Sequence, residues 1–338
     1  LLARQGVEGQ VEHGFRLFTK SGRGSDVARA LARELEAAGG LLVCEARISA
    51  VKRAPAGFVL EGQFEGHEEQ RQARMVVICT GGLSYPATGS TGDGYAWARV
   101  LGHTLTPLRA ALVGLATNEE WPRELPGLAW PDAEVALRAP AEKRRQGAAL
   151  QKERGEILFT HFGISGPAIL DLSNVFVASG LALAQLDVDF FPEVPAEELD
   201  RQLLARLKQF PNRMLANALE GFRQVPARLL ERWQKALGPP GSVPLRHFSK
   251  GARFKLRGLM KLTTLTITGT RGVEHGEVTA GGVAWEEIDP ATLESRLCAG
   301  LYFAGEMLDV AGRCGGFNLQ AAFSTGFLAG RSAGRRAK

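Results

Sequence analysis

Apolar residues in the first hundred positions recur with two different spacings. Continuous apolar runs at 41–44 and 75–79 are typical of strands buried on both faces, and 57–64 predicts a further strand. The segment before 41–44 has helical spacing instead, with one apolar face made of Val27, Leu31, Leu35 and Ala38. This order of elements is typical of the later part of a dinucleotide-binding domain, whose first βαβ unit we expect to be absent.

The pattern changes after residue 108. Residues 109–194 form short apolar runs broken by prolines and polar turns, which predicts a small antiparallel barrel that 262–275 completes. Residues 195–261, between these two parts, have helical spacing. We therefore expect an α/β protein with a discontinuous Rossmann-like domain at 1–108 and 276–338. A substrate domain, made of the barrel and a helical subdomain, is inserted at 109–275.

The strongest candidate for a binding site lies between residues 300 and 330. Leu301–Ala304 predicts a buried parallel strand, and Gly305-Glu306 follows at its carboxyl end, where open α/β sheets bind ligands. Glycines at 312, 315 and 316 let the backbone approach a flat or phosphorylated group. The spacing then predicts a helix that packs on the sheet through one stripe: Leu319, Ala322, Phe323, Gly326, Phe327 and Gly330.

This strand, turn and helix place a helix N-terminus beside a possible cofactor. Backbone amides near the start of the helix and the positive end of its dipole favour negative charge, such as the charge on a reduced flavin ring. An ordinary strand-turn-helix unit, with glycines that serve packing alone, explains the same spacing. A second glycine-rich loop at 84–94 carries hydroxyls and a tyrosine, which suits a ligand, although a capped loop without a ligand is the alternative.

Composition and charge narrow the class of protein. The 338 residues are 45% hydrophobic and 23% charged, as in soluble globular proteins. A net charge of +5 permits an acidic ligand such as a dinucleotide and does not demand nucleic acid. None of the four cysteines falls in a C-x-x-C pair, so we expect neither a metal site nor a disulfide framework. We find no membrane-length apolar run and no signal-peptide pattern, and we expect a cytoplasmic protein.

Four stretches together resemble one known family. They are TGGLSYPATGSTGDGY at 80–95, LFTHFGISGPAIL at 158–170, GTRGVEHGEVTAGGV at 269–283 and AGEMLDVAGRCGGFNLQAAFSTG at 304–326. Over essentially its whole length the chain resembles the bacterial FAD-dependent oxidoreductases of the YhiN/BaiN type, also called the aminoacetone oxidase family. That family opens with a strand–GxGxxG–helix unit. The resemblance implies that this chain starts after that unit, and that its pyrophosphate and adenosine sites are incomplete.

The resemblance also implies an FAD site and assigns residues to it. Arg47 and Ile48 match the strand that touches the adenine. Thr80, Gly81 and Gly82 match the turn that lies along the dinucleotide.

The flavin end of the cofactor is assigned in the same way. Gly305 and Glu306 match the motif whose acid binds the ribityl chain, and Tyr85, Thr279 and Gly281 are expected near the isoalloxazine. The segment over the pyrimidine end of the flavin is matched by Gly315, Gly316, Phe317, Asn318 and Leu319.

The implied reaction is hydride transfer through FAD. NAD(P)H, docking transiently, reduces the flavin, which passes electrons to a small organic acceptor or to oxygen, while the protein supplies orientation and charge. Tyr85, His161 and Cys314 are the candidates for the catalytic proton donor. For His161, a purely structural role is the alternative.

Two further functions stay open beside a small-molecule oxidoreductase. One is a flavin enzyme that modifies RNA, prompted by the pI near 9.2 and by a basic stretch: Arg246, His247, Lys250, Arg253, Lys255 and Arg257. The other is a non-catalytic nucleotide-binding protein. The sequence favours a small-molecule substrate over nucleic acid, and it fixes neither the substrate nor the oligomeric state.

Overall fold

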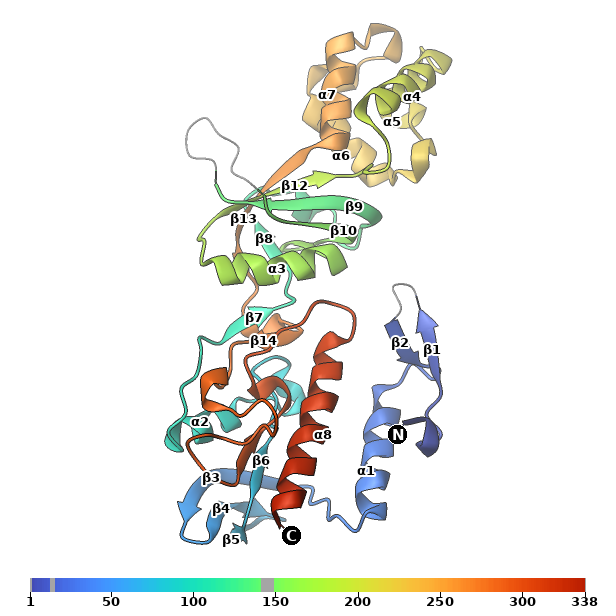
Figure 1. The fold of residues 1–338 in the computed structure, drawn as a ribbon. Helices are drawn as coiled ribbons and strands as arrows, with labels where there is room; N and C mark the ends of the chain where they lie inside the picture. The colour runs from blue at the N-terminus through green and yellow to red at the C-terminus, as the bar shows by residue number, and fades with distance from the viewer. Residues whose placement is uncertain (1, 13–15, 141–148, 338) are drawn as a thin grey trace. The chain divides into compact units, whose positions relative to one another are not determined.

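The computed structural model describes residues 2–12, 16–140 and 149–337 (Figure 1). The chain divides into two compact units. One comprises Leu1–Arg109 and Val278–Lys338, and the other comprises Ala110–Glu277. The second unit is thus inserted into the first.

In its described residues, the first unit contains several short strands and three helices. Its helices are α1 (Gly24–Ala37), α2 (Asp93–Val100) and α8 (Phe317–Ala337). Its strands are β1 (Gly9–Glu12), β2 (Arg16–Thr19), β3 (Ala46–Ala54), β4 (Gly57–Phe64), β5 (His67–Ala73), β6 (Val76–Ile78), β14 (Val278–Ala280) and β15 (Leu301–Phe303). β3, β4 and β5 form an antiparallel meander, whereas β15 pairs in parallel with β6.

The parallel pair of β6 and β15 lies at the core of the first unit. Leu301, Tyr302 and Phe303 are each at most 1% exposed, as expected for a strand covered on both faces. Because Phe303 is level with Ile78 in this pair, the segments that follow the two strands leave the same edge. These segments are the turn from Thr80 and the 3-10 turn η10 (Gly305–Met307).

The helix α8 corrects one expectation. The predicted stripe is exposed: Leu319 is 67% and Phe327 70% exposed. The helix instead contacts β6 and β15 through the face that carries Thr325 and the fully buried Ala329. Small side chains on this face allow the close approach that phenylalanine rings prevent.

The apolar run at 41–44 is also not a buried strand. It has no regular secondary structure, and Leu41 is 82% exposed. In the described part of the chain no strand pairs with it, so its backbone groups have no ladder to join.

The second unit is a closed antiparallel barrel with helices attached. The barrel strands are β8 (Leu115–Thr117), β9 (Ala129–Arg138), β10 (Ala149–Thr160), β11 (Gly163–Ser165), β12 (Ala184–Asp189) and β13 (Thr263–Thr270), and β7 (Arg109–Ala111) lies outside the barrel. The barrel order is β10-β11-β8-β13-β12-β9. Two register shifts between β9 and β10, one of them at Gly155, help these long strands to curve.

The helices of the second unit share the barrel core. They are α3 (Pro167–Ser179), α4 (Ala196–Gln209), α5 (Leu215–Ala218), α6 (Ala227–Leu237) and α7 (Lys250–Lys261). Phe190, beyond the end of β12, stacks edge-on against Trp233 of α6 at 5.4 Å between ring centres. Its carbonyl accepts a hydrogen bond from the Trp130 indole at 2.9 Å. One continuous apolar cluster therefore joins the barrel to the helical subdomain.

Candidate cofactor site

Glu306 and Thr279 tie together three segments of the first unit. Glu306 Oε1 accepts a hydrogen bond from the Thr279 backbone amide at 2.5 Å. Thr279 Oγ1 in turn accepts from the amides of Leu83 and Ser84, at 2.8 and 3.2 Å. One carboxylate and one hydroxyl thus hold η10, β14 and the turn after β6 in register.

Glycine is required where these segments meet. A β-carbon built on Gly82 would press against Thr279 Oγ1 and come within 2.5 Å of Glu306 Oε1. Gly281 has a φ of +89°, a conformation that residues with side chains rarely adopt, and its amide donates to Asp309 Oδ1 at 3.1 Å. Gly82 therefore lets the backbone pack closely against the Glu306 carboxylate, and Gly281 allows the tight turn after β14.

Two helices fix the position of η10. Tyr95 of α2 donates its hydroxyl hydrogen to the Glu306 carbonyl at 2.8 Å, and Thr325 of α8 accepts the Gly305 amide at 2.9 Å. Burial raises the pKa of Tyr95 well above its usual range, and the carboxylates of Glu306 and Asp309 raise it further. Tyr95 therefore keeps its proton and remains a donor at neutral pH.

The turn before α8 is clipped by one asparagine. Asn318 Oδ1 accepts the Gly312 amide at 2.7 Å, and its Nδ2 donates to the Gly312 carbonyl at 3.2 Å. Gly315 and Gly316 have φ values of +130° and +90°, so the chain reaches the helix through conformations that favour glycine. The amides of the first helical turn have no carbonyl of their own helix to bind, which suits an electron-rich ligand.

The predicted cofactor residues fall into two groups. One group lies on the segments just described: Thr80, Gly81, Gly82, Thr279, Gly281, Gly305, Glu306, Gly315, Gly316, Phe317, Asn318 and Leu319. Arg47 and Ile48 lie on β3, in the separate antiparallel meander, where Arg47 is exposed and Ile48 is half-buried. Among the described residues, neither of them forms a side-chain hydrogen bond with the first group.

The three candidate proton donors have different surroundings. Tyr85 is 53% exposed and follows Ser84, whose amide Thr279 binds. Cys314 is half-buried in the turn before α8. His161 is exposed in the second unit, on the turn between β10 and β11, and its ring meets the Phe162 ring edge-on at 5.2 Å between ring centres.

The sequence patterns did not identify the residues that position the site through hydrogen bonds. Tyr95, Asp309 and Thr325 hold η10 and β14 in place, but none has a spacing that marks it. The proximity of Tyr95 to Glu306 depends on a contact between segments more than two hundred residues apart. No local signal reports such a contact.

A hydrogen-bonded chain of serine, histidine and glutamate lies elsewhere in the first unit. Ser295 Oγ and Glu287 Oε2 lie 2.9 and 3.0 Å from the two ring nitrogens of His103. The order is that of a hydrolase triad, but Ser295 Oγ also accepts the amides of Leu297 and Cys298, and Ser295 is only 6% exposed. We therefore assign this chain to structure rather than to catalysis.

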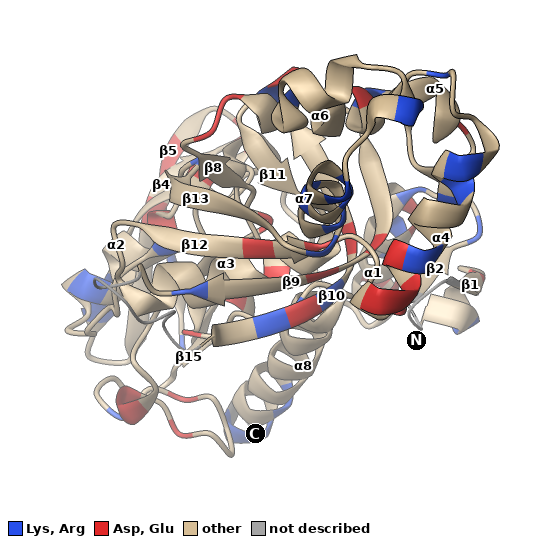
Figure 2. Ribbon diagram, turned by 90° about the horizontal axis from the view of Figure 1, so that it is seen from above, with Lys and Arg blue, Asp and Glu red and all other residues tan. Residues whose placement is uncertain are grey.

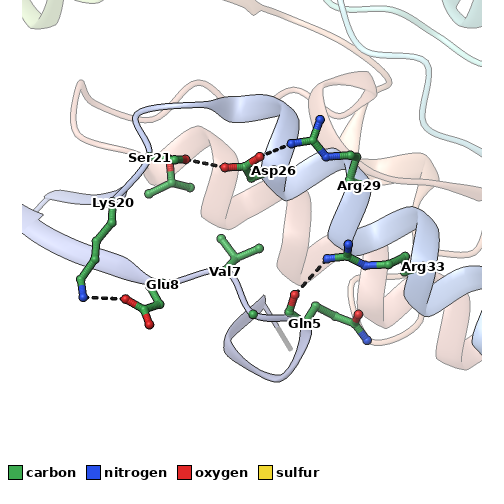
Figure 3. Close-up of a pocket in the computed structure, with 10 residues that line it drawn as sticks. Gln5, Val7, Glu8, Lys20, Ser21, Asp26, Arg29 and Arg33 are labelled. Atoms are coloured by element: carbon green, nitrogen blue, oxygen red, sulfur yellow. Dashed lines mark hydrogen bonds and ion pairs between the residues drawn. The ribbon is translucent and has the colours of Figure 1, made fainter.

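A pocket of about 350 Å³ lies near the N-terminus, between α1 and the β1–β2 hairpin (Figure 3). Its charged groups bind one another: Lys20 pairs with Glu8 at 2.6 Å, and Arg29 pairs with Asp26. Arg33 donates to the Gln5 carbonyl at 2.9 Å. This pocket contains none of the predicted site residues.

In the residues that the structure describes, no three His, Cys, Asp or Glu side chains gather as metal ligands would. Within the same residues, no helix combines the length and apolarity needed to cross a bilayer.

Comparisons with known proteins identify relatives along the chain. The family model described as "HI0933-like protein Rossmann domain" matches residues 1–332. The 3-dehydro-bile acid delta(4,6)-reductase of Clostridium scindens is 34% identical over 323 residues, which cover 95% of this chain and 76% of the relative.

Two further relatives carry a different name. The ribosomal RNA dihydrouridine synthase of Haemophilus influenzae is 30% identical over 336 residues, or 99% of this chain and 79% of that protein. The Escherichia coli protein of the same name is 32% identical over 280 residues, or 82% of this chain and 64% of the relative. Since the family model spans nearly all of the chain, the chain belongs to the HI0933-like family of FAD-binding Rossmann-domain oxidoreductases.

Proposed function

We propose that the protein is an FAD-dependent reductase that takes hydride from NAD(P)H and delivers it to a small organic acceptor. The observation that carries the proposal is the bonded pair of Glu306 and Thr279, which holds η10, β14 and the turn after β6 at one edge of the β6–β15 pair. Carboxyl ends of parallel strands are where α/β proteins bind nucleotide cofactors.

The residues present fit a flavin in two respects. Gly82 brings backbone, rather than a side chain, against the Glu306 carboxylate, and Gly281 lets the chain turn tightly beside β14. No atom within 4 Å would obstruct a β-carbon on Gly316, so the backbone before α8 is open to a flat ring. FAD, when bound, supplies the hydride-transfer chemistry.

The protein's own residues would bind and orient the flavin and supply the proton to the acceptor. The second carboxylate oxygen of Glu306 would accept a hydroxyl of the ribityl chain, while the first stays bound to Thr279. The first turn of α8 would favour negative charge at the pyrimidine end of the flavin. Tyr85 and Cys314 are the proton donors nearest in sequence to these segments, and His161 is the candidate from the inserted unit.

We infer the class of acceptor from chemistry that the relatives share. A delta(4,6)-reductase and a dihydrouridine synthase both saturate a carbon–carbon double bond conjugated to a carbonyl group. Such a bond accepts hydride at its β-carbon and a proton at its α-carbon. A cyclic enone is therefore the acceptor to test first, and reduction of oxygen is the side reaction to control for.

A second candidate function is reduction of a uracil base in RNA. Two relatives named for that activity align over 82% and 99% of this chain. Uracil contains the same conjugated unit as an enone, so one flavin site would serve either substrate. The observation that favours this function is the excess of positive charge in the helical subdomain, residues 195–261.

The test is anaerobic spectroscopy. Purified protein loaded with FAD should lose its absorbance near the flavin maximum when NADH or NADPH is added, and regain it when a cyclic enone follows. If NAD(P)H leaves the bound flavin oxidised, or if no enone or uracil compound reoxidises it, the proposal is wrong.

A further inference from the structure

Positive charge is concentrated in the helical subdomain, residues 195–261. This segment contains 14 Lys and Arg against 5 Asp and Glu, a net charge of +9. The other residues contain 27 Lys and Arg against 31 Asp and Glu, a net charge of −4. Figure 2 shows blue positions along α7 and on the segments near α4 and α5. The mildly basic total thus conceals a strongly basic subdomain on an acidic remainder.

Helix α7 carries the most concentrated part of this charge. It contains five Lys and Arg residues and no acidic residue. Arg253 pairs with Asp200 at 3.0 Å, and Lys261 pairs with Asp189 at 2.5 Å. Within the described residues, Lys250, Lys255 and Arg257 have no carboxylate partner within 4 Å. Their charge is therefore available to a ligand.

An exposed aromatic ring lies among these cations. Phe254 is 38% exposed, although the apolar face of the same helix is buried through Leu256 and Met260. Three cationic groups approach its ring centre: Lys250 Nζ and Arg253 Cζ at 5.3 Å, and Arg257 Cζ at 4.9 Å. A ring flanked by cations is the platform on which unpaired bases stack in nucleic-acid-binding proteins.

The basic surface extends beyond α7 through a pair of bonded turns. Arg246 donates its backbone amide to the Pro211 carbonyl at 2.7 Å and its Nη1 to Asn212 Oδ1 at 2.8 Å. In the same turn, Arg213 Cζ lies 4.7 Å from the ring centre of Phe210. Ser249 caps α7 by accepting the Ala252 amide at 3.1 Å, directly after this contact. The cations are therefore held on a rigid scaffold rather than on a free tail.

We propose that Arg246, Lys250, Phe254, Lys255 and Arg257, here called the α7 surface, are a docking surface for structured RNA. The cations bind phosphates on either side of an unpaired base, and that base stacks on Phe254. The proposal names the macromolecule that would bring a uracil to the flavin, and in that respect it rests on the second proposed function. RNA binding itself requires neither bound flavin nor turnover.

The chemistry of the α7 surface favours RNA over two other partners. An anionic membrane would need a continuous exposed apolar face, but α7 buries that face and exposes the single ring of Phe254. An acidic protein would satisfy the charges but would give no reason to keep an exposed ring between them. Unpaired bases, which RNA loops present, use both features.

The test is fluorescence anisotropy with the full chain and a labelled RNA hairpin that has a uridine-rich loop. A blunt RNA duplex and phosphatidylglycerol vesicles serve as competing probes. We expect Phe254→Ala to weaken hairpin binding by about tenfold and duplex binding much less, because only an unpaired base stacks. Phe254→Tyr should restore hairpin binding.

Removing positive charge from α7 should change how RNA affinity depends on salt concentration. The double variant Lys250→Ala with Arg257→Ala should make the slope of log affinity against log salt concentration less negative by about 1.4. The matched control is Lys52→Ala with Arg99→Ala, which removes the same charge from exposed positions of the first unit. Circular dichroism confirms that each variant is folded.

Three results would overturn the proposal: equal hairpin affinity for wild type and Phe254→Ala, an equal salt slope in both double variants, or tighter binding to vesicles than to the hairpin. Reduction of the flavin by NAD(P)H and its reoxidation by an enone should be unchanged in all α7 variants. If the wild type binds no hairpin while its flavin chemistry is intact, this proposal fails and the proposed reaction stands.

Discussion

The Glu306 carboxylate accepts a hydrogen bond from the backbone amide of Thr279 at 2.5 Å, although Thr279 lies in β14 and Glu306 lies in η10. This hydrogen bond makes the position of the carboxylate a property of the β14 backbone, so Glu306 is oriented before any ligand arrives. A carboxylate held in this way can offer its second oxygen to a cofactor without first losing side-chain freedom.

Removing that carboxylate should destabilise the first unit. Glu306→Ala leaves the Thr279 amide without its acceptor, and we expect a loss of about 1–3 kcal/mol in the free energy of unfolding. Glu306→Gln keeps an acceptor oxygen and should lose less. Urea denaturation measures both variants, and equal stability of Ala and Gln variants would show that the bond contributes nothing.

Gly82→Ala should disturb the same bond without changing any charge. The added methyl group would press on Thr279 Oγ1 and Glu306 Oε1, and overpacking of this kind costs about 1–3 kcal/mol. The matched control is Gly326→Ala in α8, where no atom lies within 4 Å of the new β-carbon. The control should be neutral or slightly more stable, because alanine favours helix. If both variants unfold at the same urea concentration, the packing at Gly82 is not tight.

Gly316→Val tests the turn before α8. Gly316 has a φ of +90°, which a β-branched residue rarely adopts, so the backbone should move away from its position at the start of the helix. We expect reduced flavin occupancy, measured as the ratio of flavin absorbance to protein absorbance. Gly330→Ala, farther along α8, is the control, and unchanged occupancy in Gly316→Val would mean that this turn does not hold the flavin.

His103 should make stability depend on pH. Burial lowers the pKa of His103, and the nearby Glu287 carboxylate offsets this only in part, so the folded protein keeps the ring neutral. The unfolded chain binds a proton at about pH 6.5. As the pH falls below that value, the unfolded state gains protons that the folded state does not, and stability should fall by up to about 1.4 kcal/mol per pH unit.

The comparison that isolates this effect is His103→Gln, which cannot titrate. Its free energy of unfolding should change less between pH 7 and pH 5 than that of the wild type, even if the variant is less stable throughout. Parallel pH profiles for the two proteins would contradict the assignment of a neutral buried His103.

The architecture was predictable because it is recorded in local patterns. The inserted barrel followed from short runs with polar turns at 109–194 and 262–275, and the structure closes six of those strands into a barrel. The parallel strand at 301–303 followed from its unbroken apolar run, and it is almost fully buried.

The errors arose where the sequence does not say which of two surfaces is covered. The stripe that includes Phe323 and Phe327 has the spacing of a buried helix face, but α8 uses its small-residue face to approach the strands. Likewise, Leu41 and Leu42 have the composition of a strand but no partner among the described residues.

The candidate site also has a part that could be predicted from the sequence and a part that could not. Glycine motifs and Glu306 could be found from the sequence, because glycine spacing and a strand-end acid are local signals. The hydrogen bonds that position them, from Tyr95 and Thr279 among others, join residues separated by 27 to 211 positions and could not be found without coordinates.

The most direct measurement of the central claim is the visible spectrum of the protein, expressed with any coding sequence upstream of Leu1 and titrated with FAD under anaerobic conditions. We predict bound flavin that NAD(P)H bleaches, with occupancy reduced in Gly316→Val and in Glu306→Ala but not in Gly326→Ala. A protein that binds no flavin, or one whose flavin occupancy is the same in all four forms, would contradict the claim that Glu306 and the turn before α8 hold the cofactor.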